Sequence, residues 1–327
     1  MTPQPPTETP LEPSPTSGLF WTLAFPDTAA RPGWEWRHFD LVHSQARASI
    51  EADPRIPRFA QAVVTASDDN ARIVTDGTAV AGVLPAYSHS MAEDKYEVIL
   101  WRFAMMPDHL VTGRRHPART LITLWHAINN DGLAPSGPAA LIELAIAQFA
   151  REVRSRLASL ATQLDALEES LLTRHDSAGL AATGRRLGSI RRESVRLRRA
   201  LAPVDRILHG DNEELPEWAR RKEHDAANRV VHGALDDITA LAERARSLHD
   251  ELTTRLAEET NRRLYLVSMV TALALPAAFI TGFFGMNTTG LLWSGDKAPA
   301  YGTLYALGTC ALAVLAMLGV LRWKKLL

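Results

Sequence analysis

The alternation of apolar and polar positions divides this chain into a mixed first part, a long helical middle and an uncharged end. Over residues 18–137, short apolar and β-branched runs alternate with turn residues, which is typical of strands joined to short helices. From residue 138 onward, apolar residues recur at helical spacing with few breaks. The pattern therefore predicts an α+β domain followed by long helices.

Short segments of the first part carry the strand pattern: residues 19–25, 34–41, 71–87, 96–106 and 109–115. Within the third segment, Asp76 and Gly77 stand between two β-branched runs, which predicts a hairpin. Asp108 marks a turn between the last two segments. Helices are expected between the second and third strands and around residues 120–130. We therefore expect an α/β arrangement whose strands pair partly in antiparallel fashion.

Helices dominate the middle of the chain. Residues 139–172 and most of 181–208 keep apolar residues at helical spacing, with breaks at 175–179 and 209–217. From Trp218 one helix is predicted to continue to Phe284, because no helix-ending signal intervenes. At ~1.5 Å per residue this helix would be ~100 Å long. Such a rod cannot be buried in a monomer, so it either projects below a membrane or packs against copies of itself.

The end of the chain contains two uncharged runs, at residues 264–284 and 298–321. A helix needs ~20 apolar residues to cross a bilayer, so both runs predict membrane spans. Basic residues flank the pair on its outer sides: Arg262, Arg263, Arg322, Lys324 and Lys325. Because basic residues favour the cytoplasmic side, we expect a multi-pass protein of the cytoplasmic membrane with both termini in the cytosol.

These patterns give four predicted regions. Residues 1–17 are expected to form a disordered, proline-rich tail. Residues 18–137 form a cytosolic α/β subdomain, and residues 138–263 form a cytosolic helical region that ends in a stalk helix. Residues 264–327 form a membrane domain of two helices.

Composition and charge narrow the class of function. The 36 Lys and Arg residues nearly balance the 37 Asp and Glu residues, which argues against nucleic acid as the main partner. A single cysteine, Cys310, excludes an intramolecular disulfide and a cysteine-cluster zinc site. No nucleotide-binding loop, nucleophile motif or acid–base pair stands out, so we expect neither an enzyme nor a bound cofactor.

One charged stretch requires a separate interpretation. Residues 185–199 contain seven arginines. They could form a nucleic-acid surface, but the run lacks the interleaved aromatic residues that stack on bases. We therefore expect a charged helix face opposite the acidic side chains Asp165, Glu168 and Glu169.

The first predicted span has two unlike faces on a helical wheel. One face carries a stripe that includes small and polar residues: Asn261, Leu264, Val267, Thr271, Leu275 and Ala278. The other is bulky and apolar, with Leu266, Met269, Leu273 and Ile280. The stripe fits either a tight helix–helix interface or the wall of a pore. Because two spans cannot enclose a pore, the second interpretation requires an oligomer.

The span leads into a specific motif. Pro276 lies in mid-span, and the segment NRRLYLVSMVTALALPAAFITGFFGMN at residues 261–287 ends on Gly285, Met286 and Asn287. With the two-span tail and the long stalk, this segment resembles the CorA superfamily of divalent-cation transporters, whose signature is Gly-Met-Asn. The following TTGLLW, and the segments 36–41, 164–172 and 198–208, resemble its ZntB-like, zinc-transporting branch.

The resemblance implies a homopentamer with a funnel-shaped cytosolic part and a pore lined by the first span. Gly285, Met286 and Asn287 would be the selectivity motif, with a ring of Asn287 amides holding a hydrated divalent cation rather than a bare one. Leu264, Val267 and Leu275 would form apolar constrictions, and Asn261 and Thr271 would form polar rings. Zinc is the expected cation. Magnesium or cobalt transport, and a non-transporting membrane-anchored scaffold, are the alternatives.

Overall fold

The computed structural model describes residues 20–28, 32–68, 70–90, 95–173, 177–209, 214–220, 225–285 and 302–323. It divides into two compact units, Met1–His249 and Asp250–Leu327. The predicted tail at residues 1–17 lies outside the described residues.

The first unit contains a six-stranded sheet in the order β1-β2-β6-β5-β4-β3. The strands are β1 (Phe20–Phe25), β2 (Trp34–Asp40), β3 (Arg72–Thr75), β4 (Val80–Ser90), β5 (Lys95–Met105) and β6 (His109–Arg114). All neighbours are antiparallel except β2 and β6, which are parallel. Every predicted strand is present, so the expectation of partly antiparallel pairing is confirmed.

The predicted turn at Asp76 and Gly77 joins β3 to β4. The Asp76 carboxylate accepts hydrogen bonds from the backbone N–H groups of Thr78 (2.9 Å) and Ala79 (3.2 Å). Gly77 adopts a φ of 88°, a conformation that glycine reaches without the steric cost of a Cβ. The local sequence therefore fixes this hairpin.

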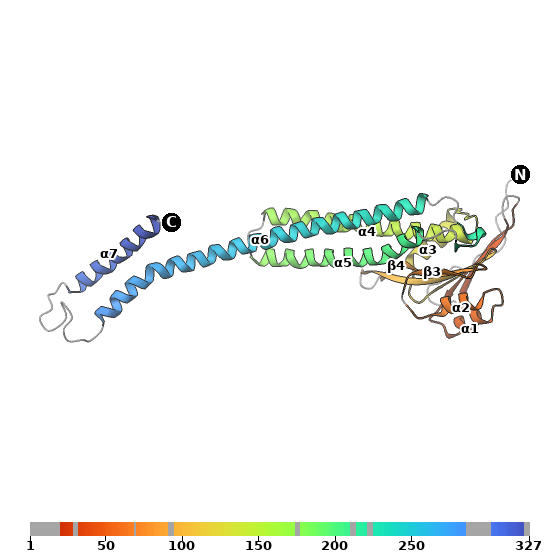
Figure 1. Ribbon diagram of the computed structural model, residues 1–327, viewed down its shortest axis with the longest axis horizontal. Coiled ribbons are helices and arrows are strands. Elements are labelled where there is room, and N and C mark those ends of the chain that lie inside the picture. The colour runs from red at the N-terminus through yellow and green to blue at the C-terminus, as the bar shows by residue number, and fades with distance from the viewer. Residues whose placement is uncertain are drawn as a thin grey trace. The chain divides into compact units, whose positions relative to one another are not determined.

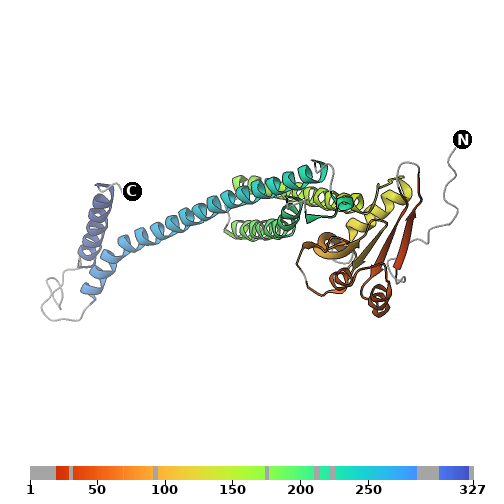
Figure 2. The same cartoon turned by 45° about the vertical axis from the view of Figure 1, so that its right-hand side comes forward.

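Short helices cover the sheet, as Figure 2 shows. α1 (Ser44–Ala52) and α2 (Arg58–Thr65) contribute Ile50 and Ala60 to a core cluster with Phe39, Val83 and Val111 of the sheet. Because successive side chains of a strand point to opposite faces, Thr112 lies on the face away from Val111. α3 (Arg119–Asn130) covers that other face, where the rings of Trp21 and Trp125 lie 6.4 Å apart.

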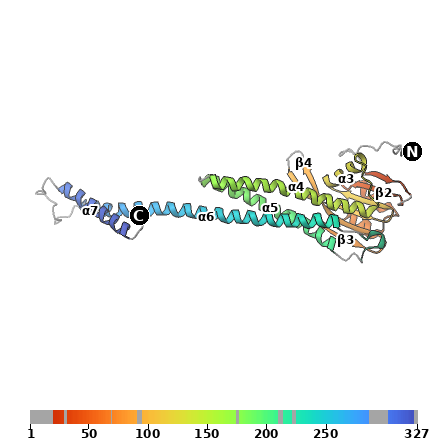
Figure 3. The same cartoon turned by 90° about the horizontal axis from the view of Figure 1, so that it is seen from above.

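Long helices follow the sheet: α4 (Pro138–Thr173), α5 (Ser177–His209) and α6 (Asp225–Phe284). Figures 1 and 3 show α4, α5 and the first part of α6 running side by side. Each helix buries apolar residues at three- and four-residue spacing, such as Leu157, Leu160 and Leu164 of α4, and Leu197, Leu201 and Val204 of α5. The helical middle predicted from the sequence is confirmed.

Two predicted helix boundaries are wrong. Trp218 lies in a short 3₁₀ turn, Glu217–Ala219, and α6 begins at Asp225 and has 60 residues. Pro216 accepts hydrogen bonds at its carbonyl from Ala219 and Arg220, and Arg220 has an extended ψ of 129°. An extended Arg220 cannot continue a helix from Trp218. The break expected at 175–179 is also shorter, because α5 begins at Ser177.

Two of the three expected partners of the arginine run are wrong. Asp165 and Glu168 of α4 pair with Arg244 of α6, at 2.7 and 2.6 Å. From the run itself, Glu193 binds Arg156 of α4 through two nitrogens, at 2.6 and 3.0 Å. Tertiary packing decides that α6, rather than α5, supplies the partner of Asp165. The charge pattern of a single helix does not specify that packing.

Replacing Arg244 by Gln should lower the free energy of unfolding by less than about 1 kcal/mol, since exposed ion pairs are screened by water. The side chains of Arg244, Asp165 and Glu168 are each about half exposed, at 48%, 59% and 47%. Urea unfolding of the variant beside Arg246→Gln, an exposed arginine on the same helix, would measure this. A loss of more than about 2 kcal/mol specific to Arg244 would contradict it.

Candidate ion-conducting helix

The second half of α6 is apolar and exposed. Within the described residues, one helix is long and apolar enough to cross a membrane, at Ala226–Phe283, and its most apolar window is not buried at all. α7 (Gly302–Trp323) is the other apolar helix described, and its searched part, Leu307–Trp323, is shorter. The first predicted span is therefore matched by a suitable helix, whereas the second stays a prediction.

The predicted stripe lies along one exposed side of α6. Its apolar members Leu264, Val267 and Leu275 are 59%, 64% and 64% exposed. Its other members, Asn261, Thr271 and Ala278, are exposed as well. Steps of three and four residues keep all six on one side of the helix.

The opposite side of α6 is partly covered. Half-buried positions recur there: Met269, Ala272, Leu273, Pro276, Ala277 and Ile280. In α7, which belongs to the same unit, half-buried positions recur with the same periodicity: Cys310, Ala313, Val314, Met317, Leu318 and Leu321. Cys310 Sγ lies 4.0 Å from the Ala277 carbonyl oxygen, which places the two helices in contact. The bulky side of α6 therefore faces α7, and the stripe with the polar residues faces away from it.

Thr271 is the polar residue at the centre of the stripe. Its hydroxyl donates a hydrogen bond to the Val267 carbonyl of the preceding turn, at 2.8 Å. A hydroxyl has one proton and two acceptor lone pairs, so the donor is used within the helix and the lone pairs stay available. The stripe thus offers an oxygen acceptor without a competing O–H donor, which suits a hydrated cation.

The helix continues through Pro276 and ends just before the Gly-Met-Asn motif. Proline has no N–H group, so it cannot donate to the Ala272 carbonyl as other helical residues would. Gly285 donates its N–H to the Thr281 carbonyl at 2.9 Å, and a Cβ there would lie 3.2 Å from the same oxygen. Glycine therefore relieves a tight contact at this end. Met286 and Asn287 lie outside the described residues.

A metal centre among the described residues would be marked by a cluster of acidic, histidine or cysteine side chains. No group of three or more His, Cys, Asp or Glu side chains within the described ranges is arranged to hold a metal ion. Along one side of α6 lie six of the residues predicted to line a pore: Asn261, Leu264, Val267, Thr271, Leu275 and Ala278.

Known proteins resemble this chain over most of its length. Residues 32–325 match the family described as CorA-like Mg2+ transporter protein. The zinc transport protein ZntB of Yersinia enterocolitica is 25% identical over 307 residues, which covers 91% of this chain and 88% of that protein. A ZntB of Pectobacterium atrosepticum is 34% identical over 144 residues, or 42% of each chain.

Solved structures share the fold. The full-length CmaX protein superposes with a TM-score of 0.72 at 22% identity, and 89% of each chain is covered. The CorA magnesium transporter of Methanocaldococcus jannaschii gives a TM-score of 0.65 at 15% identity, covering 88% of this chain and 90% of that one.

The family match over residues 32–325 identifies a transporter rather than an enzyme. The chain belongs to the family of CorA-like Mg2+ transporter proteins, because the family match extends over nearly its whole length. The resemblance read from residues 261–287 is thereby confirmed, and the class of activity is the transport of divalent metal cations.

Proposed function

We propose that this protein transports zinc across the cytoplasmic membrane, as a homopentamer with both termini in the cytosol and a pore lined by α6. The observation that carries the proposal is the exposed stripe of α6, which lies on the side away from α7. Within the predicted span, the stripe carries the Thr271 hydroxyl, whose lone pairs would find no donor against lipid. Packing of several α6 helices around an axis would remove the stripe from lipid and enclose a path for ions.

The residues of the stripe suit a hydrated ion. Apolar rings of Leu264, Val267 and Leu275 would narrow the path, Asn261 and Thr271 would offer oxygen atoms, and small Ala278 would leave room. Conduction requires sites that attract an ion without holding it, and amide and hydroxyl oxygens meet that requirement better than a full charge does. At the outer end, Gly285, Met286 and Asn287 would form the selectivity motif.

The choice of cation depends on the relatives. Residues 261–285 contain no Cys or His, the ligands that would select zinc by their softness. Zinc is proposed because the relatives that match most of the chain are zinc transport proteins. Magnesium or cobalt is the second choice, in line with the description of the family.

Flux of zinc and magnesium into proteoliposomes tests this function, with wild type, Asn287→Ala and the neighbouring Thr288→Ala as the control. We expect zinc flux in wild type, a loss of at least several-fold in Asn287→Ala and little change in Thr288→Ala. Dependence on a pH gradient would indicate proton coupling. A magnesium flux larger than the zinc flux would identify magnesium, rather than zinc, as the transported cation. Absence of both fluxes, in folded and oligomeric protein, would instead indicate a membrane-anchored scaffold.

A further inference from the structure

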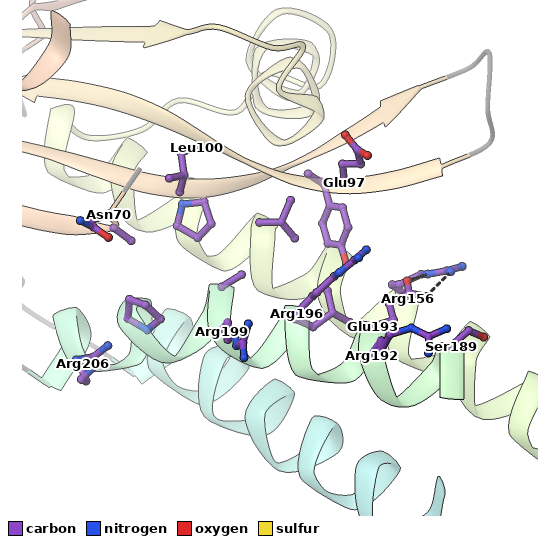
Figure 4. A pocket seen from close by; sticks show the side chains of 17 residues that line it. Asn70, Glu97, Leu100, Arg156, Ser189, Arg192, Glu193, Arg196, Arg199 and Arg206 are labelled. Carbon is purple, nitrogen blue, oxygen red and sulfur yellow. Dashed lines mark hydrogen bonds and ion pairs between the residues drawn. The ribbon is translucent and has the colours of Figure 1, made fainter. Parts of the chain in front are cut away.

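A basic cleft lies in the first unit, between α5 and the β4–β5 strands, away from the residues of the proposed pore. Its volume is about 970 Å³. Among the described residues, five arginines line it, against two glutamates: Arg156, Arg192, Arg196, Arg199 and Arg206, with Glu97 and Glu193. The described lining therefore carries three more positive charges than negative ones. Figure 4 shows Arg196 rising from α5 toward the strands above it.

The arginines are placed on one side of α5 by their spacing. Relative to Arg192, steps of 100° per residue place Arg196, Arg199 and Arg206 within about 40°. The buried residues Ile190, Leu201 and Leu208 lie on the opposite side of the helix, near 160° to 180° by the same ~100° step. Packing of that side against the bundle therefore fixes the direction of the arginine row.

Most of this charge is not neutralised within the described protein. Glu193 is bound by Arg156 through two nitrogens, at 2.6 and 3.0 Å. Arg192, Arg196, Arg199 and Arg206 are exposed and form no side-chain hydrogen bond or ion pair with the described residues. Like charges at this spacing repel one another, so the cleft gains stability from an anion that bridges them.

The shape of the cleft favours a small anion over a polymer. Its volume falls within the range of about 300–1,000 Å³ that is usual for small-molecule sites. Proteins that bind single-stranded nucleic acid use exposed aromatic rings for stacking. Tyr87 is the aromatic residue among the described lining residues, and it is only 2% exposed. Guanidinium groups bind phosphate oxygens in pairs.

We propose that this cleft binds a small anion that carries two or more phosphate groups, either an inorganic polyphosphate or a nucleoside triphosphate. Arg192, Arg196 and Arg199 of α5 would bind the phosphate groups of the anion. Arg156 also lines the cleft, but its charge is already paired with Glu193. This site is independent of zinc transport, so either proposal can fail alone.

Calorimetric titration of the full-length protein in detergent, in metal-free buffer, tests the site with tripolyphosphate and with ATP. The Arg196→Gln/Arg199→Gln pair should weaken tripolyphosphate binding by about tenfold or more, since it removes charge-assisted hydrogen bonds. The Arg191→Gln/Arg198→Gln pair removes the same charge from the same helix outside the cleft, and should weaken binding by less than about threefold. Arg206→Gln removes another arginine of the lining and should also weaken tripolyphosphate binding.

Elution volume and urea unfolding must match wild type for each variant, which is expected because all these arginines are exposed. Equal affinities for ATP and tripolyphosphate would mean that the cleft recognises the phosphate groups alone. A higher affinity for ATP would mean that the natural ligand is a nucleoside triphosphate. Undetectable binding by wild type, or equal weakening by the two pairs, would overturn the proposal. Tighter binding of a single-stranded oligonucleotide, affected equally by both pairs, would identify a nucleic-acid surface instead.

Discussion

A positively charged thiol reagent attached at position 271 will block zinc flux, and the same reagent applied to position 273 will not. The chain has one cysteine, Cys310, so Cys310→Ala gives a background without reactive thiols. In that background Thr271→Cys places a thiol at the centre of the exposed stripe of α6. Leu273→Cys places one on the half-buried side that faces α7.

The expected block is large for an electrostatic reason. Two unit charges about 8 Å apart interact by ~2 kcal/mol at an effective dielectric constant near 20. A divalent cation doubles this barrier to about 4 kcal/mol, and even part of it would reduce flux by about a hundredfold. The charges would be contributed by every subunit around the pore, which increases the effect.

Flux should be measured before reagent, after reagent and after reduction by a thiol, while mass spectrometry reports the labelled fraction. Fully labelled Thr271→Cys with unchanged flux would show that the stripe does not line the path. An equal block at Leu273→Cys would mean that the side facing α7 is also in contact with the ions. Either result would mean that the path of the ions is not lined by the stripe of α6 alone, as proposed.

The sequence predicted those features that depend on local pattern. The strands follow from alternation, and the hairpin at Asp76 and Gly77 follows from turn chemistry that about five residues suffice to specify. The stripe of α6 follows from residue spacing alone, because a helix maps sequence onto faces without help from its neighbours. For the same reason, the side of α6 that contacts α7 agrees with the bulky face of the helical wheel.

Features that depend on which elements meet were missed. The arginine run was assigned three acidic partners, of which Asp165 and Glu168 in fact pair with Arg244. The row of arginines that begins at position 192 could have been recognised from the spacing of four, three and seven residues to Arg206, but the strands that complete the cleft come from residues about a hundred positions earlier. The start of α6 was missed because the backbone at Arg220, rather than its helix propensity, ends the preceding turn.

Acid should destabilise the first unit through His38, and His38→Gln should remove much of this sensitivity. His38 is 4% exposed, and its Nδ1 lies 2.8 Å from the Thr112 hydroxyl. That hydroxyl accepts the Trp36 indole N–H at 2.9 Å. The hydroxyl proton can be donated to Nδ1 or to the Arg37 carbonyl at 3.4 Å, so these contacts accommodate either tautomer of a neutral ring. Burial, aided by the nearby positive charge of Arg114, lowers the pKa of His38 from 6.5 to about 3.

The direction of the pH effect follows from this lowered pKa. Below pH 6.5 the unfolded chain binds a proton at His38 that the folded chain does not, so the free energy of unfolding falls as the pH decreases toward about 3. At about 1.36 kcal/mol per unit, the loss at pH 5 is about 2 kcal/mol relative to pH 7.5. Glutamine does not titrate, and its amide group can either accept a hydrogen bond from the Thr112 hydroxyl or donate one to it.

Urea unfolding of the full-length protein at pH 7.5 and pH 5, followed by tryptophan fluorescence, compares wild type, His38→Gln and His126→Gln. His126 lies exposed on α3 and serves as the matched control. We expect the acid-induced loss to shrink by about 2 kcal/mol in His38→Gln and to persist in His126→Gln. An unchanged loss in His38→Gln would mean that the imidazole of His38 becomes protonated within the folded sheet, and that other groups cause the sensitivity to acid.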